Sequence, residues 1–181
     1  MLIYAIALTM KGKAKKELTE LRTRFGTNMN YSIEPHVTIM FRFTLKTDIR
    51  IIQNRLSEIA TQTRPFMLVL NGIRCWEGKN NVAYIAVQNQ LPVYNLQAMI
   101  IDALEGLISA DTTFNLQNFI AHLTINEHVP NESMSTLKKE LLAYHPEYRV
   151  NINSFTLFAA ETNEKPEKWV PARIFRFSKT K

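Results

Sequence analysis

The stretch Pro35-His36-Val37-Thr38-Ile39 recurs in almost the same form as Ala121-His122-Leu123-Thr124-Ile125. The second copy follows the first by about half the length of the 181-residue chain. In both copies His and Thr alternate with large apolar side chains, which is the two-residue period of a β-strand. The repeat therefore predicts two strands, one in each half of the chain, with the same pair of polar side chains.

On a strand, side chains two residues apart point to the same face. His36 is therefore expected to share a face with Thr38, and His122 with Thr124, while the apolar residues between them point into the protein. Each half would present one imidazole and one hydroxyl together.

The pattern around the two motifs predicts further strands and helices. An apolar strand at residues 2–8 precedes a helix at 11–24, and Asp48 is positioned to cap a second helix that ends before Pro65. Strand, helix, strand, strand and helix then occur twice in this order, which predicts one domain of mixed α+β type over residues 1–181, built from two similar halves. The other expected elements are helices at 92–107 and 134–142, strands at 33–43, 66–76, 82–87, 119–125, 150–160 and 172–177, a turn at 77–81 and a polar loop at 161–171.

Composition limits the class of protein. A hydrophobic share of 46% is enough for a buried core, and 21% charged residues without long single-residue runs exclude disordered and fibrous proteins. Cys75, the single cysteine, can form no internal disulfide, and the apolar run at residues 1–10 is too short to span a bilayer and lacks a secretory leader. We therefore expect a cytoplasmic monomer that makes no membrane contact. The net charge of +6 favours a phosphate-bearing partner only weakly, because a basic surface also serves solubility.

The paired His and Thr residues suit the cleavage of a phosphodiester. One histidine would take a proton from the attacking water and the other would give a proton to the departing oxygen, so neither a metal ion nor a cofactor is expected. The hydroxyls of Thr38 and Thr124 would donate to the charged phosphoryl oxygens. The structural alternative is that the two histidines only hydrogen-bond to nearby backbone across a packed interface.

Three further residues are candidates for substrate binding. Arg42 continues the alternation from His36 through Thr38 and Met40, so it is placed to meet phosphate, although a solvated arginine at a strand end is the alternative. Trp76 and Trp169 are candidates for stacking on a base, with ordinary packing as the alternative for each.

These features resemble the two-histidine phosphoesterase superfamily, whose signature is a pair of His-x-Thr/Ser elements on strands, and within it the bacterial and archaeal 2′-5′ RNA ligase-like branch. The stretch 65–73 followed by the strand 82–87 is similar to the strand pair that lies between the motifs in that family. The resemblance implies a bilobal fold with pseudo-twofold symmetry, made of antiparallel sheets with flanking helices around a central cleft. It also implies action on 2′,3′-cyclic or other nucleotide or RNA-terminal phosphodiesters, with both histidines and both threonines lining the cleft.

One departure from the family pattern concerns the substrate. In the ligase-like branch the second motif is often followed by an arginine-containing stretch, whereas Ile125-Asn126-Glu127 follows here and offers no cation. Two alternatives to an enzyme stay open, namely a module that binds phosphorylated RNA ends or nucleotides without turnover and a degenerate member that serves as a scaffold. The sequence also leaves open which histidine is the acid and which is the base.

Overall fold

The structure is a computed structural model that describes residues 1–26, 33–78, 81–110, 119–163 and 167–178. Its helices are α1 (Gly12–Phe25), α2 (Ile49–Gln62), α3 (Leu91–Leu104) and α4 (Asn131–Leu142). The strands are β1 (Leu2–Thr9), β2 (His36–Leu45), β3 (Phe66–Trp76), β4 (Val82–Val87), β5 (Ile108–Ala110), β6 (His122–Glu127), β7 (Glu147–Ile152), β8 (Ser154–Glu161) and β9 (Val170–Arg176).

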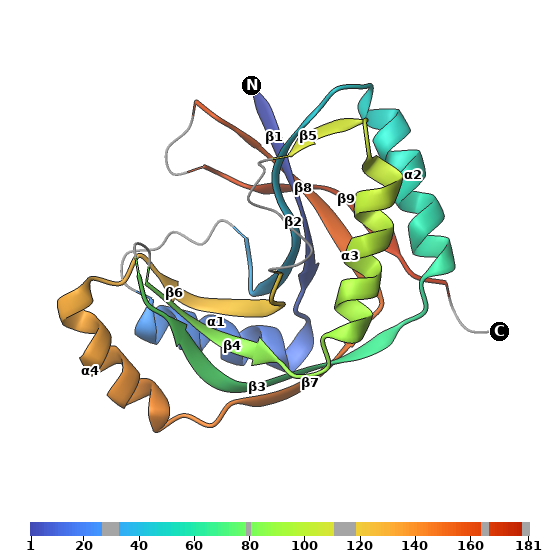
Figure 1. The fold of residues 1–181 in the computed structure, drawn as a ribbon. Helices are drawn as coiled ribbons and strands as arrows, with labels where there is room; N and C mark the ends of the chain where they lie inside the picture. Colours follow the sequence, from blue (N-terminus) through green and yellow to red (C-terminus); the bar gives the residue numbers. More distant parts are fainter. Residues whose placement is uncertain (27–32, 79–80, 111–118, 164–166, 179–181) are drawn as a thin grey trace.

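The strands form two antiparallel sheets flanked by the helices (Figure 1). Sheet A has the strand order β5-β2-β1-β8-β9, and sheet B has the order β6-β4-β3-β7. The first motif lies on β2 of sheet A and the second on β6, at the edge of sheet B. The predicted α+β architecture of antiparallel sheets with flanking helices is confirmed.

The strand predicted at 150–160 is wrong, because this stretch forms two strands in different sheets. β7 pairs with β3 in sheet B, and β8 pairs with β1 in sheet A, so the chain crosses between the sheets at Asn153. β5, which pairs with β2, was not predicted because it is only three residues long. Lys79 and Asn80 of the predicted turn, and residues 164–166 of the predicted polar loop, lie outside the described residues.

The main core lies between each sheet and its helices. α1 and α4 contact sheet B, while α2 and α3 contact sheet A and each other (Figure 1). α1 packs through Leu18, Leu21 and Phe25, whose spacing places them on one helical face. Asp48 caps α2 as predicted, since its side chain accepts a hydrogen bond from the Arg50 amide at 2.8 Å. No helix in the described part of the chain is long and apolar enough to cross a bilayer.

Each motif strand is packed by a helix from the other half of the chain. α1, from the first half, contacts β6, and α3, from the second half, contacts β2. Arg22 of α1 is 3% exposed, and its guanidinium donates from Nε to the Thr124 carbonyl at 2.9 Å and from Nη1 to the Ile33 carbonyl at 3.2 Å. One buried side chain therefore links the second motif to the segment that leads into the first.

We expect Arg22→Met to lower the free energy of unfolding by about 2 kcal/mol or more, because two main-chain carbonyls would lose their donor away from water. Chemical denaturation at pH 7.5 measures the change. The matched control is Arg55→Met on the exposed side of α2, which should change stability by less than about 0.5 kcal/mol. Equal unfolding midpoints for the two variants would contradict a structural role for Arg22.

Candidate active site

The two motifs come together where the sheets meet, because β2 and β6 lie in contact there (Figure 1). His36 and His122 are the first residues of these strands, and both are half-buried, as are Thr38 and Thr124. The alternate residues, Val37, Ile39, Leu123 and Ile125, belong to the main core. The expected facing of the motifs is confirmed, and we call the sheet faces that carry the histidines and threonines the motif faces.

The two imidazoles are held in the same way. Nδ1 of His36 lies 2.9 Å from the carbonyl oxygen of Glu34, and Nδ1 of His122 lies 2.7 Å from that of Ile120, so each ring bonds to the residue two positions before it. A carbonyl oxygen only accepts hydrogen bonds, so Nδ1 must carry the proton in both rings. In the neutral rings Nε2 is therefore the atom with a lone pair available for proton transfer.

A β-bulge follows the threonine in both motifs. In β2, Thr38 and Met40 pair with the consecutive residues Ala7 and Ile6 of β1, so Ile39 is an extra residue. In β6, Thr124 and Asn126 pair with the consecutive residues Tyr84 and Ala83 of β4, so Ile125 is an extra residue. The extra residues, Ile39 and Ile125, are fully buried. Bulges redirect side chains and end regular alternation, so each His-x-Thr pair is set apart from the rest of its strand.

Burial and charge both keep His36 neutral. Its pKa is lowered to about 4, first by burial and then by the positive charge of Arg22, while the hydrogen bond to Glu34 acts in the opposite direction. The charge of His122 also lowers the pKa of His36, as expected for two imidazoles in one site. At neutral pH the ligand-free site therefore holds His36 without a proton on Nε2.

Two aromatic rings that contact each other lie beside His122. The ring of Trp76, at the end of β3, meets the imidazole edge-on at a centroid distance of 4.5 Å, and the ring of Tyr84 on β4 lies at 5.3 Å. Burial lowers the pKa of His122, and the hydrogen bond to Ile120 opposes that shift. The structure thus places Trp76 beside one of the two histidines, while base stacking on it stays a prediction.

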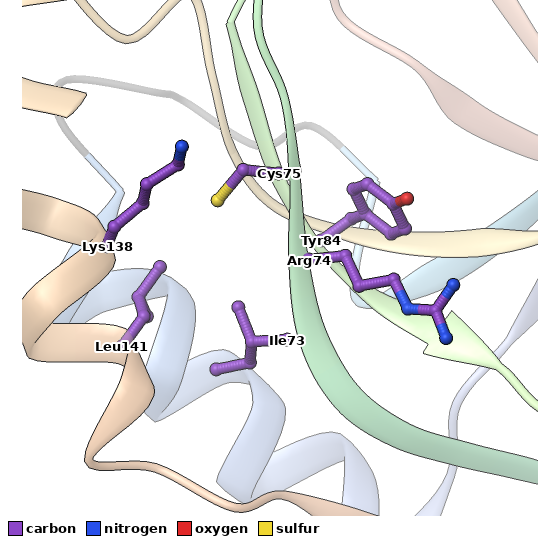
Figure 2. Close-up of a pocket in the computed structure, with 6 residues that line it drawn as sticks. All are labelled: Ile73, Arg74, Cys75, Tyr84, Lys138 and Leu141. Carbon is purple, nitrogen blue, oxygen red and sulfur yellow. The ribbon is translucent and has the colours of Figure 1, made fainter. Parts of the chain in front are cut away.

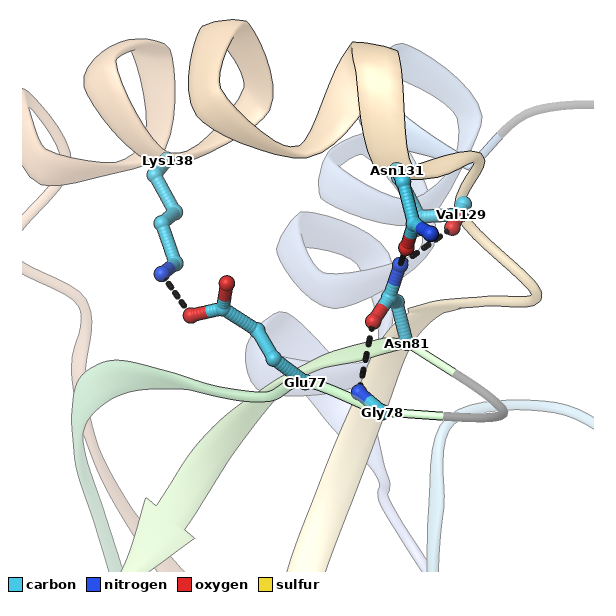
Figure 3. A network of polar contacts seen from close by, with 6 residues as sticks. All are labelled: Glu77, Gly78, Asn81, Val129, Asn131 and Lys138. Atoms are coloured by element: carbon cyan, nitrogen blue, oxygen red, sulfur yellow. Dashed lines mark hydrogen bonds and ion pairs between the residues drawn. The ribbon is translucent and has the colours of Figure 1, made fainter.

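A polar network holds Glu77, Gly78 and Asn81, which follow Trp76 (Figure 3). The Asn81 amide nitrogen donates to the Val129 carbonyl at 2.8 Å and to the Asn131 side chain at 2.6 Å, and its oxygen accepts from the Gly78 amide at 3.0 Å. Glu77 forms an ion pair with Lys138 of α4. These contacts tie the end of β3 to the connection between β6 and α4, so the position of Trp76 is well supported.

The register argument for Arg42 is wrong. After the first bulge Met40 points into the main core, a second irregularity lies between Met40 and Phe43, and Arg42 has a positive φ of 50°. The Arg42 guanidinium forms an ion pair with Glu167, shortly before Trp169. A phosphate contact by Arg42 therefore stays a prediction, and the strand alternation no longer supports it.

Trp169 lies in a second apolar cluster on the motif face of sheet A. It is 8% exposed and packs against Phe41 with ring centroids 5.7 Å apart. The cluster includes Ala7, which pairs with Thr38, so Trp169 packs on the same side of the sheet as the first motif. Its contacts are those of a packing residue, and base stacking on it is likewise only a prediction. The cluster consists of Ile3, Ala5, Ala7, Ile33, Phe158, Ala160 and Trp169.

The family model of the 2′-5′ RNA ligase superfamily matches residues 11–164. The chain belongs to the 2′-5′ RNA ligase superfamily. This confirms the resemblance to two-histidine phosphoesterases. The comparison with curated proteins gave no match.

Solved structures of this superfamily fold share the architecture at low sequence identity. TT0787 of Thermus thermophilus superposes with a TM-score of 0.65 at 13% identity, and E. coli LigT complexed with 3′-AMP superposes with 0.64 at 13% identity. In both comparisons the match covers 97% of this chain and 97% of the other. These likenesses show that the chain has the LigT-like fold.

A separate pocket is lined by residues of β3, β4 and α4, namely Ile73, Arg74, Cys75, Tyr84, Lys138 and Leu141. Ile73 and Cys75 of β3 point toward Lys138 and Leu141 of α4 (Figure 2). Burial raises the pKa of the Cys75 thiol, so this sulfur stays protonated and poorly reactive. Among the described residues, no group of three or more His, Cys, Asp or Glu side chains could hold a metal ion.

Two residues that shape the site, Arg22 and Tyr84, were not predicted as site residues. Arg22 is four residues after Leu18 and three before Phe25, so its place on the apolar face of the helix was visible in the sequence. Tyr84 lies opposite Thr124 in the sheet, and this pairing depends on register that the sequence does not display.

We expect the stability of the protein to fall as the pH drops from 6.5 to about 4, in part because unfolding lets His36 take up a proton that the folded site disfavours. His36→Gln removes this contribution, so its unfolding free energy should depend less steeply on pH in that window. Urea denaturation at half-unit pH steps measures both curves, which should run parallel above pH 6.5. Equal slopes below pH 6.5 would show that His36 is not held neutral by the fold.

Proposed function

We propose that this protein is a phosphoesterase that hydrolyses 2′,3′-cyclic or related nucleotide and RNA phosphodiesters by general acid–base catalysis, without a metal ion. The observation that carries the proposal is the matched geometry of His36 and His122. Both rings donate from Nδ1 to a carbonyl two residues earlier, and both keep Nε2 for the substrate. Superfamily membership supports a reaction at a phosphodiester.

In the proposed reaction one histidine accepts a proton and the other donates one. One neutral imidazole accepts a proton from water through Nε2 as the water oxygen attacks phosphorus. The other imidazole, protonated on Nε2, gives its proton to the ribose oxygen as the bond between that oxygen and phosphorus breaks. The product is a phosphate monoester, and the hydroxyls of Thr38 and Thr124 donate to the non-bridging oxygens, where charge increases in the transition state.

We assign the base to His36 and the acid to His122. The positive charge of Arg22 lowers the pKa of His36, which favours the neutral form that a base requires. Burial is the principal cause of the lowered pKa of both imidazoles, and the charge of Arg22 lowers the pKa of His36 further. A bound phosphodiester anion raises the pKa of a nearby imidazole and would therefore protonate His122 more readily than His36. Binding of the anion would thereby supply the protonated acid.

The second candidate function is a binding module for nucleotides or phosphorylated RNA ends. E. coli LigT, which shares the fold, has been solved with 3′-AMP, with ATP and with NADP+. A site that accepts such ligands could bind them without turnover. Affinity without product would identify this class.

We expect His36→Ala and His122→Ala each to reduce turnover at least about 100-fold, since each removes one of two proton transfers. The substrates are the four nucleoside 2′,3′-cyclic monophosphates and a cyclic-ended oligonucleotide, with chelator-treated protein and separation of 2′- from 3′-monophosphates. His145→Ala, a matched change at an exposed histidine outside the motifs, should keep wild-type rates. Wild-type rates in both motif variants would exclude the proposed mechanism, and binding without product would favour the binding module.

The pH dependence gives an independent test. Because kcat/KM reports the free enzyme, and because both histidines have lowered pKa values there, we expect a bell-shaped profile with its maximum between about pH 4 and 6.5. Circular dichroism at each pH should verify that the protein is folded. A maximum at pH 7.5 or above would mean that the imidazoles are not the acid and base.

A further inference from the structure

Three side chains on adjacent strands form a row across the motif face of sheet B. Thr124 on β6 is opposite Tyr84 on β4, and Tyr84 is opposite Arg74 on β3. Figure 2 shows that Arg74 and Tyr84 extend to one side of β3, while Ile73 and Cys75 extend to the other, toward α4. The row therefore runs from a motif threonine to an arginine on the same face.

A bulge in β3 puts Arg74 on this face. The register shifts between Leu70 and Ile73, where Gly72 has a φ of +75°. Leu70 before the bulge and Ile73 after it both pack with the main core, so the alternation changes phase and Arg74 points the opposite way. In an unbroken strand Arg74 would have faced the helices.

Arg74 is an exposed cation beside the site. No carboxylate among the described residues lies within ion-pair distance of it, whereas Arg42 is paired with Glu167. Burial raises the pKa of Tyr84, and the charge of Arg74 acts against this shift, as expected for a guanidinium close to that ring. A planar guanidinium in this position is well suited to bind a phosphate.

The cation that is missing after the second motif has no substitute within β6. Asn126 is 1% exposed and donates to the Phe25 carbonyl at 2.7 Å, so it faces the core, and the next residue is Glu127. Arg74 brings a positive charge to the same face from two strands away.

We propose that Arg74 binds a second phosphate of the substrate, one nucleotide away from the phosphodiester that is cleaved, so that the substrate class is an oligonucleotide end. This inference rests on the proposed function. Two strand spacings put the Arg74 backbone about 10 Å from that of Thr124, and the buried ring of Tyr84 stands between them. The guanidinium is therefore placed to bind a phosphate other than the phosphodiester that lies at Thr124.

The experiment compares wild type, Arg74→Gln, Arg74→Lys and the control Arg55→Gln on two substrates. One is a nucleoside 2′,3′-cyclic monophosphate, and the other is a dinucleotide with the same cyclic end, which adds one internal phosphodiester. We expect Arg74→Gln to lower the ratio of kcat/KM for the dinucleotide over the mononucleotide about tenfold or more, Arg74→Lys to restore part of it, and Arg55→Gln to keep it. Equal losses on both substrates would place Arg74 at the scissile phosphate and overturn the proposal, as would an unchanged ratio.

A binding measurement separates this inference from the proposed function. A labelled oligonucleotide that ends in a 3′-phosphate is titrated with each protein at several salt concentrations. Loss of one phosphate contact should reduce the slope of log K against log salt by about 0.7 in Arg74→Gln, and Arg55→Gln should keep the wild-type slope. If wild type hydrolyses neither substrate, the proposed function fails while the slopes still decide the role of Arg74. The inference is overturned if Arg74→Gln and Arg55→Gln give the same slope. It is also overturned if the wild-type protein does not bind the oligonucleotide.

Discussion

The rest of the site depends on the hydrogen bonds that the buried guanidinium of Arg22 donates. It donates to the carbonyl of Thr124 in the second motif strand and to that of Ile33, just before the first. Gln97 of α3 makes a related contact on the other side, since its amide donates to the Ile39 carbonyl at 2.8 Å. In both cases a helix from one half of the chain holds the backbone of the motif strand from the other half.

The bulges and the Nδ1 hydrogen bonds give the two histidines equivalent surroundings, but the neighbouring groups differ. His36 lies near the charge of Arg22, whereas His122 lies beside the adjacent rings of Trp76 and Tyr84. Equal geometry with unequal electrostatics is what acid–base catalysis by two imidazoles requires, because one ring must be neutral while the other is charged. The more distant surroundings also differ, because an apolar cluster lies near His36 and Arg74 lies on the side of His122.

The sequence predicted what is periodic and local. The His-x-Thr repeat, the facing of its side chains and the Asp48 cap follow from spacings of two to four residues, and the structure agrees. The break at Asn153 and the positions of Arg42 and Arg74 depend on which strands pair and where a bulge shifts the register. A change of phase by one residue reverses the face of every later side chain, and apolar alternation does not record it. Alternation therefore points to Arg42, although the strand does not keep that alternation, and gives no sign of Arg74.

The exchange of elements between the two halves has a consequence for the origin of such a chain. α1 and β3, from the first half, complete the layer around sheet B, while α3, β8 and β9, from the second, complete the layer around sheet A. A half-length ancestor with one His-x-Thr strand would have lacked the helix, α1 or α3, that packs on that strand in the present chain. It would have folded only by trading segments with a second copy, as domain-swapped dimers do, and its active site would have needed both copies. In the present chain both sets of exchanged elements belong to one polypeptide, so each motif strand is covered from within the same chain.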